Sequence, residues 1–77
     1  MMQLNERTRA RWGSNQWTMV KLDCVETEKS VSHAQSYICY FYFDDAYKGC
    51  GVEATNKAAA KESCAEFVIK WLNEHNL

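Results

Sequence analysis

The run SYICYFYF at residues 36–43 constrains the fold more than any other part of the chain. It is dense in aromatic and β-branched residues, which favour a β-strand. The run ends at Asp44-Asp45, and the following stretch AYKGCGVEA predicts another strand. Because the link between the two runs is short, we expect them to pair as an antiparallel hairpin.

The remaining segments predict one further strand and a helix at each end. QWTMVKLDCV mixes Trp, Thr, Met, Val and Leu with polar residues, as strands do, and the polar stretch TEKSVSH after it predicts a loop. MQLNERTRAR contains good helix formers and stops at a Gly-Ser-Asn cluster. Near the end of the chain, Asn56 is a good N-cap for a helix with an apolar stripe. The expected elements are a helix at about 2–11, strands at about 16–25, 36–44 and 47–54, and a helix at about 56–74.

The order α-β-β-β-α predicts a two-layer α+β domain, with a three-stranded antiparallel sheet and both helices on one face. The length of 77 residues fits a single domain, and three Trp, four Tyr and three Phe supply large core side chains. Alternation along the strands and the stripe of the last helix predict this core: Trp17, Tyr37, Cys39, Phe41, Phe43, Ala60, Cys64, Phe67, Val68 and Trp71.

The sequence offers no pattern for a metal, a cofactor, a membrane span or catalysis. Four cysteines at 24, 39, 50 and 64 include no Cys-x-x-Cys pair, so we expect reduced thiols in an intracellular protein of the nucleus or cytoplasm. No apolar run approaches the ~20 residues of a membrane span. A Gly-rich phosphate loop is missing, and Asp44-Asp45 is typical of a turn rather than of a catalytic pair. We therefore expect a binding protein and not an enzyme.

Three short motifs, in this order of elements, resemble the double-stranded RNA-binding domain over roughly residues 2–72. Leu4, Asn5 and Glu6 match a run that is frequent in the first helix of that family. His33 takes the histidine place in the loop between the first two strands, although the Gly and Pro of the family pattern are replaced. The last helix begins NKAAAK, where Lys57 and Lys61 match two of three family lysines and Ala58 replaces the third.

The resemblance implies binding of duplex RNA by shape, across about 16 base pairs of an A-form helix. It assigns Asn5, Glu6 and His33 to the minor grooves, where 2′-hydroxyls and base edges are exposed. Lys57 and Lys61 would bind phosphates across the intervening major groove, assisted by the positive end of the helix dipole.

An alternative follows from the same strand pattern and from the net charge of only −1. If Tyr37 faces the helices, then Ile38, Tyr40 and Tyr42 point away from them, and an open sheet face would carry an apolar patch. Tyrosine is common at protein interfaces. The alternative is therefore a domain of the same fold that binds a protein partner or a second copy of itself, with weak RNA binding or none.

Overall fold

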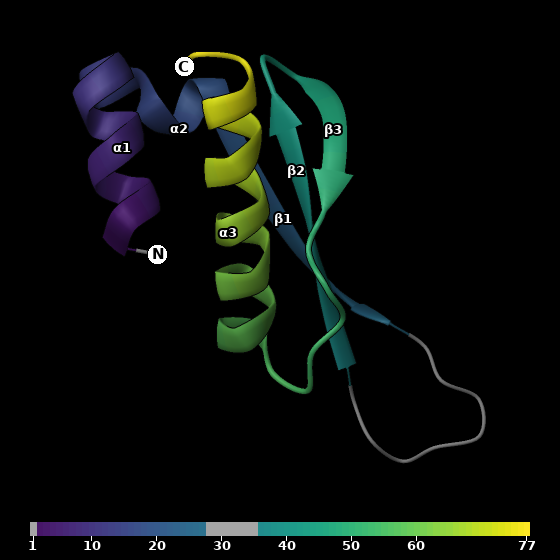
Figure 1. Ribbon diagram of the computed structural model, residues 1–77. Helices are drawn as coiled ribbons and strands as arrows, with labels where there is room; N and C mark the ends of the chain where they lie inside the picture. The colour runs from purple at the N-terminus through teal and green to yellow at the C-terminus, as the bar shows by residue number, and fades with distance from the viewer. Residues whose placement is uncertain (1, 28–35) are drawn as a thin grey trace.

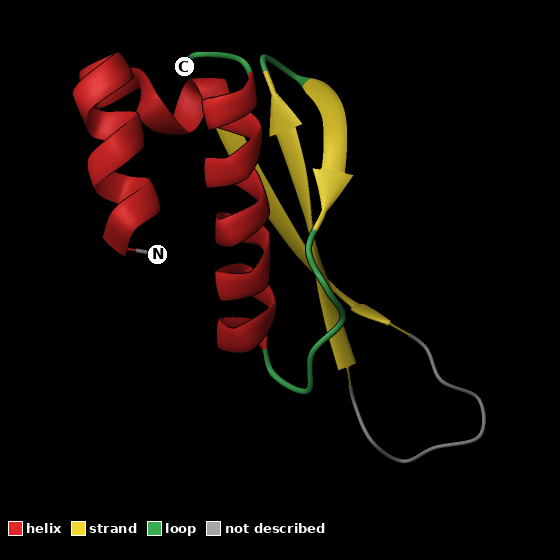
Figure 2. Ribbon diagram, in the orientation of Figure 1, coloured by secondary structure: helices red, strands yellow, loops and turns green. Residues whose placement is uncertain are grey.

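The computed structural model describes residues 2–27 and 36–77 and confirms the order α-β-β-β-α. It contains these elements: α1 (Met2–Trp12), a 3-10 turn (Gly13–Asn15), α2 (Gln16–Met19), β1 (Val20–Thr27), β2 (Ser36–Phe43), β3 (Ala46–Cys50) and α3 (Lys57–Glu74). The strands form one antiparallel sheet in the order β1-β2-β3. Both long helices lie on the same side of that sheet, with α3 against the strands and α1 beside α3 (Figures 1 and 2).

The predicted hairpin between β2 and β3 turns through two residues. Phe43 pairs with Ala46, so that Asp44 and Asp45 alone make the connection. Both have positive φ, 50° and 65°. A two-residue hairpin of type I′ requires positive φ at both positions, and Asp tolerates this conformation better than most residues. The Asp-Asp pair is thus a turn, as the sequence predicts.

The expectation of a strand from residue 16 is wrong for residues 16–19, which form the helical turn α2. The reason is a polar contact with α1. The buried Gln16 amide donates from Nε2 to Asn5 Oδ1 and to Thr8 Oγ1, both at 2.9 Å. Gly13, with φ of +58°, lets the chain turn back so that Gln16 reaches α1. β1 therefore begins at Val20.

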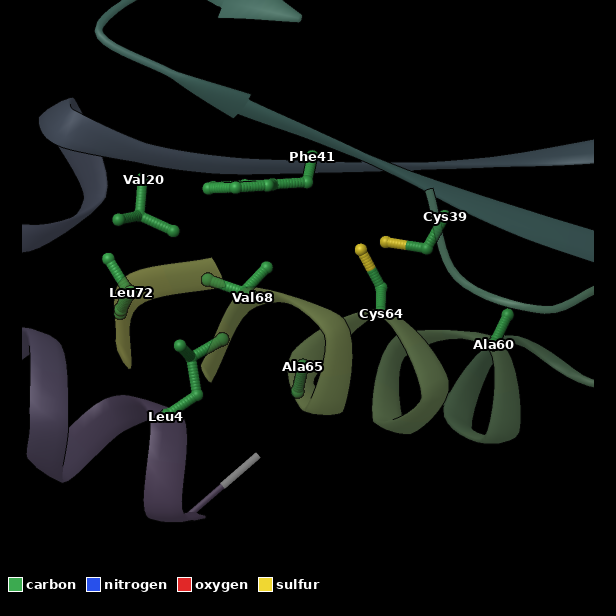
Figure 3. Close-up of a cluster of buried hydrophobic side chains, with 9 residues drawn as sticks. All are labelled: Leu4, Val20, Cys39, Phe41, Ala60, Cys64, Ala65, Val68 and Leu72. Atoms are coloured by element: carbon green, nitrogen blue, oxygen red, sulfur yellow. The ribbon is translucent and has the colours of Figure 1, made fainter. Parts of the chain in front are cut away.

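The hydrophobic core lies between the sheet and α3 and extends to α1 (Figure 3). Five predicted core residues are fully buried, namely Cys39, Phe41, Ala60, Cys64 and Val68. Four more are partly buried against them, namely Tyr37, Phe43, Phe67 and Trp71. Trp17 was expected in the core as part of a strand, but it lies in α2 and is 45% exposed. The buried hydrophobic residues that the prediction did not include are Leu4, Val20, Ala65 and Leu72.

The third strand ends at Cys50, earlier than the predicted residue 54. After it, the Gly51 N–H donates to the Cys39 carbonyl at 3.0 Å, and Tyr37 and Ala54 exchange two backbone hydrogen bonds. The Val52 N–H donates instead to Ser63 Oγ on α3, at 2.7 Å. Contact with α3 thus interrupts the regular ladder, while Ala54 keeps the chain beside β2.

Candidate nucleic-acid interface

The two helix starts assigned to RNA are directed towards one end of the domain. α1 and α3 run in the same direction, and their N-terminal ends point towards the end of the sheet where β1 stops and β2 starts (Figure 1). Thr27 and Ser36 are the described residues at that end of the sheet. His33, between them in sequence, lies outside the described residues.

The start of α3 has the features of an anion-binding helix terminus. Asn56 caps the helix by accepting from the Ala59 N–H with its Oδ1 atom, at 2.8 Å. Because the first N–H groups of a helix have no acceptor within it, those of Lys57 and Ala58 are left for a ligand or water. The Lys57 side chain is exposed, and its Nζ lies 5.8 Å from the centre of the Tyr37 ring. That cation–π contact holds the ammonium group beside the helix start.

Lys61 is one turn further along α3 and is also exposed. It borders an open pocket of about 310 Å³ together with Trp17, Val20, Lys21 and Leu22. The neighbouring cation Lys21 is engaged by Asp45, with 2.6 Å between Nζ and Oδ1. Among the described residues, Lys61 has no ion-pair partner. Its ammonium group is therefore available for an anion.

On α1, Asn5 and Glu6 are exposed, but they differ in their contacts. Asn5 Oδ1 accepts from Gln16 Nε2, so the amide oxygen holds α1 against α2. Within the described part of the chain, no partner of Glu6 is found. Arg7 has a role that the sequence did not suggest. Its Nε and Nη2 atoms donate to the Leu77 carbonyl at 3.4 and 3.3 Å, which joins α1 to the residues after α3.

The open face of the sheet carries a group of tyrosines that we call the tyrosine surface, made of Tyr40, Tyr42 and Tyr47. Tyr40 and Tyr42 are half-buried on β2, and Ile38 beside them is half-buried as well. Tyr47 on β3 is 55% exposed, and its ring centre lies 6.0 Å from that of Tyr40 and 5.7 Å from that of Tyr42. Sequence reasoning missed Tyr47, although the two-residue hairpin that pairs Phe43 with Ala46 also places Tyr47 opposite Tyr42.

Two of the four cysteines are buried between the sheet and α3, and the other two are half-buried. Cys39 and Cys64 are buried, and their sulfur atoms point towards each other (Figure 3). Burial raises the pKa of both thiols, which disfavours the reactive thiolate. All four cysteines are free thiols. In the described ranges, no three His, Cys, Asp or Glu side chains are grouped so that they would hold a metal ion, and no helix there is long and apolar enough to cross a membrane.

Comparison of the chain with known proteins found no match to any protein-family model, curated protein or solved structure.

Proposed function

We propose that this protein binds double-stranded RNA by shape, as a domain of the double-stranded RNA-binding type. The observation that supports this proposal best is the parallel direction of α1 and α3, whose starts point towards the end of the sheet with the two residues that flank the β1–β2 connection. We propose that a duplex lies along these three elements, because recognition of successive grooves requires contacts at separate places along the RNA helix.

In this proposal, α3 binds the phosphates of the RNA. The free N–H groups of the first turn and the helix dipole attract an anion, and the exposed ammonium groups of Lys57 and Lys61 add positive charge on the same helix. On α1, the Glu6 carboxylate accepts hydrogen bonds from 2′-hydroxyl groups or base edges in the minor groove, and Asn5 stands beside it. His33 reaches the second minor groove from the β1–β2 connection.

Binding should be moderate in affinity and sensitive to salt. Each phosphate contact contributes about 0.9 to the slope of log affinity against log salt concentration. Two lysines therefore account for a slope of about 2. The net charge of −1 supplies no broad attraction to RNA, so the local site must carry the affinity.

The test is a titration with an RNA duplex of about 20 base pairs, with DNA of the same sequence beside it, at low and moderate salt. We expect saturable binding that prefers RNA. Lys57→Ala with Lys61→Ala should weaken it at least tenfold and remove most of the salt slope.

Lys70→Ala is the matched control, because Lys70 is exposed on the same helix but near its other end. This variant should bind RNA like the original chain. Circular dichroism verifies that each variant is folded. Equal affinity of the double variant and the original protein would rule out the assigned phosphate site.

The tyrosine surface favours a second function, association with another copy of the chain through the open sheet face. The ring of Tyr47 contacts those of Tyr40 and Tyr42, so the three form a continuous aromatic surface, and Tyr47 exposes more than half of its area. Large rigid rings with a polar hydroxyl group are favoured in interfaces because they bury much area at a low entropic cost.

Sedimentation of the protein at increasing concentration tests this second function. We expect a monomer–dimer equilibrium that Tyr42→Ser with Tyr47→Ser shifts to monomer, whereas Lys48→Ser, at an exposed position beside Tyr47, leaves it unchanged. A protein that stays monomeric at millimolar concentration would exclude self-association by this face.

A further inference from the structure

Strand β1 is an edge of the sheet, and its register shows which backbone groups point outward. It pairs with β2 from Val20↔Phe43 to Thr27↔Ser36. The Asp44 N–H donates to the Met19 carbonyl at 2.9 Å, which makes residues 19 and 44 a hydrogen-bonded pair. Because such pairs alternate along an antiparallel ladder, the odd-numbered residues of β1 bond to β2. The even-numbered residues then direct N–H and C=O groups to the free edge.

Three hydrogen bonds on the other side of β2 support this assignment. The Cys39 carbonyl accepts from the Gly51 N–H, and the Tyr37 backbone bonds to Ala54. Cys39 and Tyr37 therefore turn their backbone groups away from β1, so their partners Cys24 and Glu26 have no bond to β2. The Val20 N–H is used by the Gln16 carbonyl in α2. As far as the described residues show, the free edge thus runs through Leu22, Cys24 and Glu26.

The pocket that Lys61 borders lies beside this edge, on the helix side of β1. Trp17, Val20 and Leu22 give it an apolar lining, with Trp17 almost half exposed. Of the two lysines around it, Lys21 is paired with Asp45 and Lys61 is not paired with any described residue. An apolar pocket with one available ammonium group suits a ligand that carries an apolar group and a negative charge close together.

We propose that the β1 edge binds an extended peptide of a partner protein, which joins the sheet as a fourth strand. Every second side chain of this peptide would face the helix side, the first an apolar residue against Trp17 and Leu22, and the next an acidic residue that pairs with Lys61. Successive side chains on one face of a strand are about 7 Å apart, so one pocket accommodates both. The backbone hydrogen bonds supply affinity and the two side chains supply specificity.

The other edge of the sheet is less suited to such a peptide. β3 has only five residues and contains a register shift, and bulged, short edges resist strand addition. β1 has eight residues without a shift in its pairing. The proposal does not rest on RNA binding, since only Lys61 is common to the two sites.

A random library of phage-displayed 12-residue peptides, selected on the whole 77-residue chain, tests this proposal. We expect enriched sequences in which an apolar and an acidic residue are separated by one position. When a synthetic copy of an enriched peptide binds, the Leu22, Cys24 and Glu26 amides should become protected from hydrogen exchange at least tenfold. The Lys21, Asp23 and Val25 amides, which already bond to β2, should change much less.

Variants of the protein and of the peptide then separate strand addition from other binding. Lys61→Glu and Trp17→Thr should each weaken binding at least tenfold, while Lys70→Glu and Thr18→Ala, at exposed positions outside the pocket, should not. Methylation of the peptide nitrogens that face β1 should abolish binding, and methylation of the alternate nitrogens should not. The comparison of the two methylated peptides uses the original protein, so it does not depend on whether a variant folds.

Three results would overturn the proposal. The first is a phage selection in which no peptide is enriched on the original protein relative to the Lys61→Glu variant. The second is exchange protection that appears at the tyrosine surface instead of the β1 edge. The third is equal loss of binding for both sets of methylated peptides. None of these results depends on whether the domain binds duplex RNA.

Discussion

At the scale of single residues, Gly51, directly after β3, lies close against the backbone of α3. A Cβ atom at this position would lie 2.6 Å from the backbone nitrogen of Cys64 and 2.8 Å from its Cα. A Cβ at Gly49 would also be too close to a neighbour, but that neighbour is the Phe67 ring, which is able to rotate away. The helix backbone next to Gly51 has no such freedom, so glycine is required there for packing.

We therefore predict that Gly51→Ala destabilises the domain by about 2 kcal/mol or more, as overpacking against a rigid neighbour does. Val52→Ala is the control, since Val52 is 73% exposed and its replacement should change stability by less than about 0.5 kcal/mol. Urea unfolding of the three proteins, followed by tryptophan fluorescence, measures both effects. Equal stability of Gly51→Ala and Val52→Ala would contradict the close approach.

At the scale of elements, α3 is the part of the fold against which the others pack. Its apolar stripe covers the sheet, and its residues Ala65, Val68 and Leu72 share a buried cluster with Leu4 of α1 (Figure 3). α1 is then held by polar contacts at two places, the Arg7 bonds to Leu77 and the Gln16 bonds to α1. Because the other elements pack against α3, the stability of this helix affects the whole fold, and its start also carries the proposed phosphate site.

The cap of α3 gives the prediction at this scale. Asn56→Ala removes the hydrogen bond from the Ala59 N–H and should lower the free energy of unfolding by about 1 kcal/mol. Asn56→Asp keeps an acceptor and should stay close to the original stability. Thr55→Ala, at the exposed preceding residue, is the matched control. If thermal unfolding gives Asn56→Ala and Thr55→Ala the same stability, the cap contributes little to the stability of the domain.

At the scale of the whole molecule, the buried thiols make stability depend on pH. Burial raises the pKa of Cys39 and of Cys64, so the folded state holds these protons more tightly than the unfolded state. Below the ordinary thiol pKa both states are protonated, and this contribution to stability is complete. Above it the unfolded state ionises first, and the contribution is lost as the pH rises further.

We predict that the free energy of unfolding falls as the pH rises above the ordinary thiol pKa, by up to about 1.4 kcal/mol per pH unit for each thiol. Cys39→Ala removes one of the two groups and should make the fall less steep, whatever its effect at neutral pH. Urea unfolding at a series of alkaline pH values, with a reductant present, gives the two slopes. Identical slopes would mean that the buried thiols do not control alkaline stability.

Local signals in the sequence determined the order of elements, the β2–β3 hairpin and the start of α3. A turn of two aspartates, a cap at Asn56 and an apolar stripe each act over a few residues, so they are visible without the fold. The exposed positions of Lys57 and Lys61 at the start of α3 are part of the same local pattern. Their role in RNA binding stays a prediction.

Tertiary contacts decided what these local patterns did not contain. Residues 16–19 are helical because the partners of Gln16 are in α1, and this turn exposes Trp17. Tyr47 joins the tyrosine surface because β3 pairs with β2 and places it opposite Tyr42. The pocket at the β1 edge arises because Trp17 and Lys61, far apart in sequence, lie beside the same strand. Hydrophobic period and turn chemistry depend on near neighbours, whereas exposure and pocket shape depend on residues that only folding brings together.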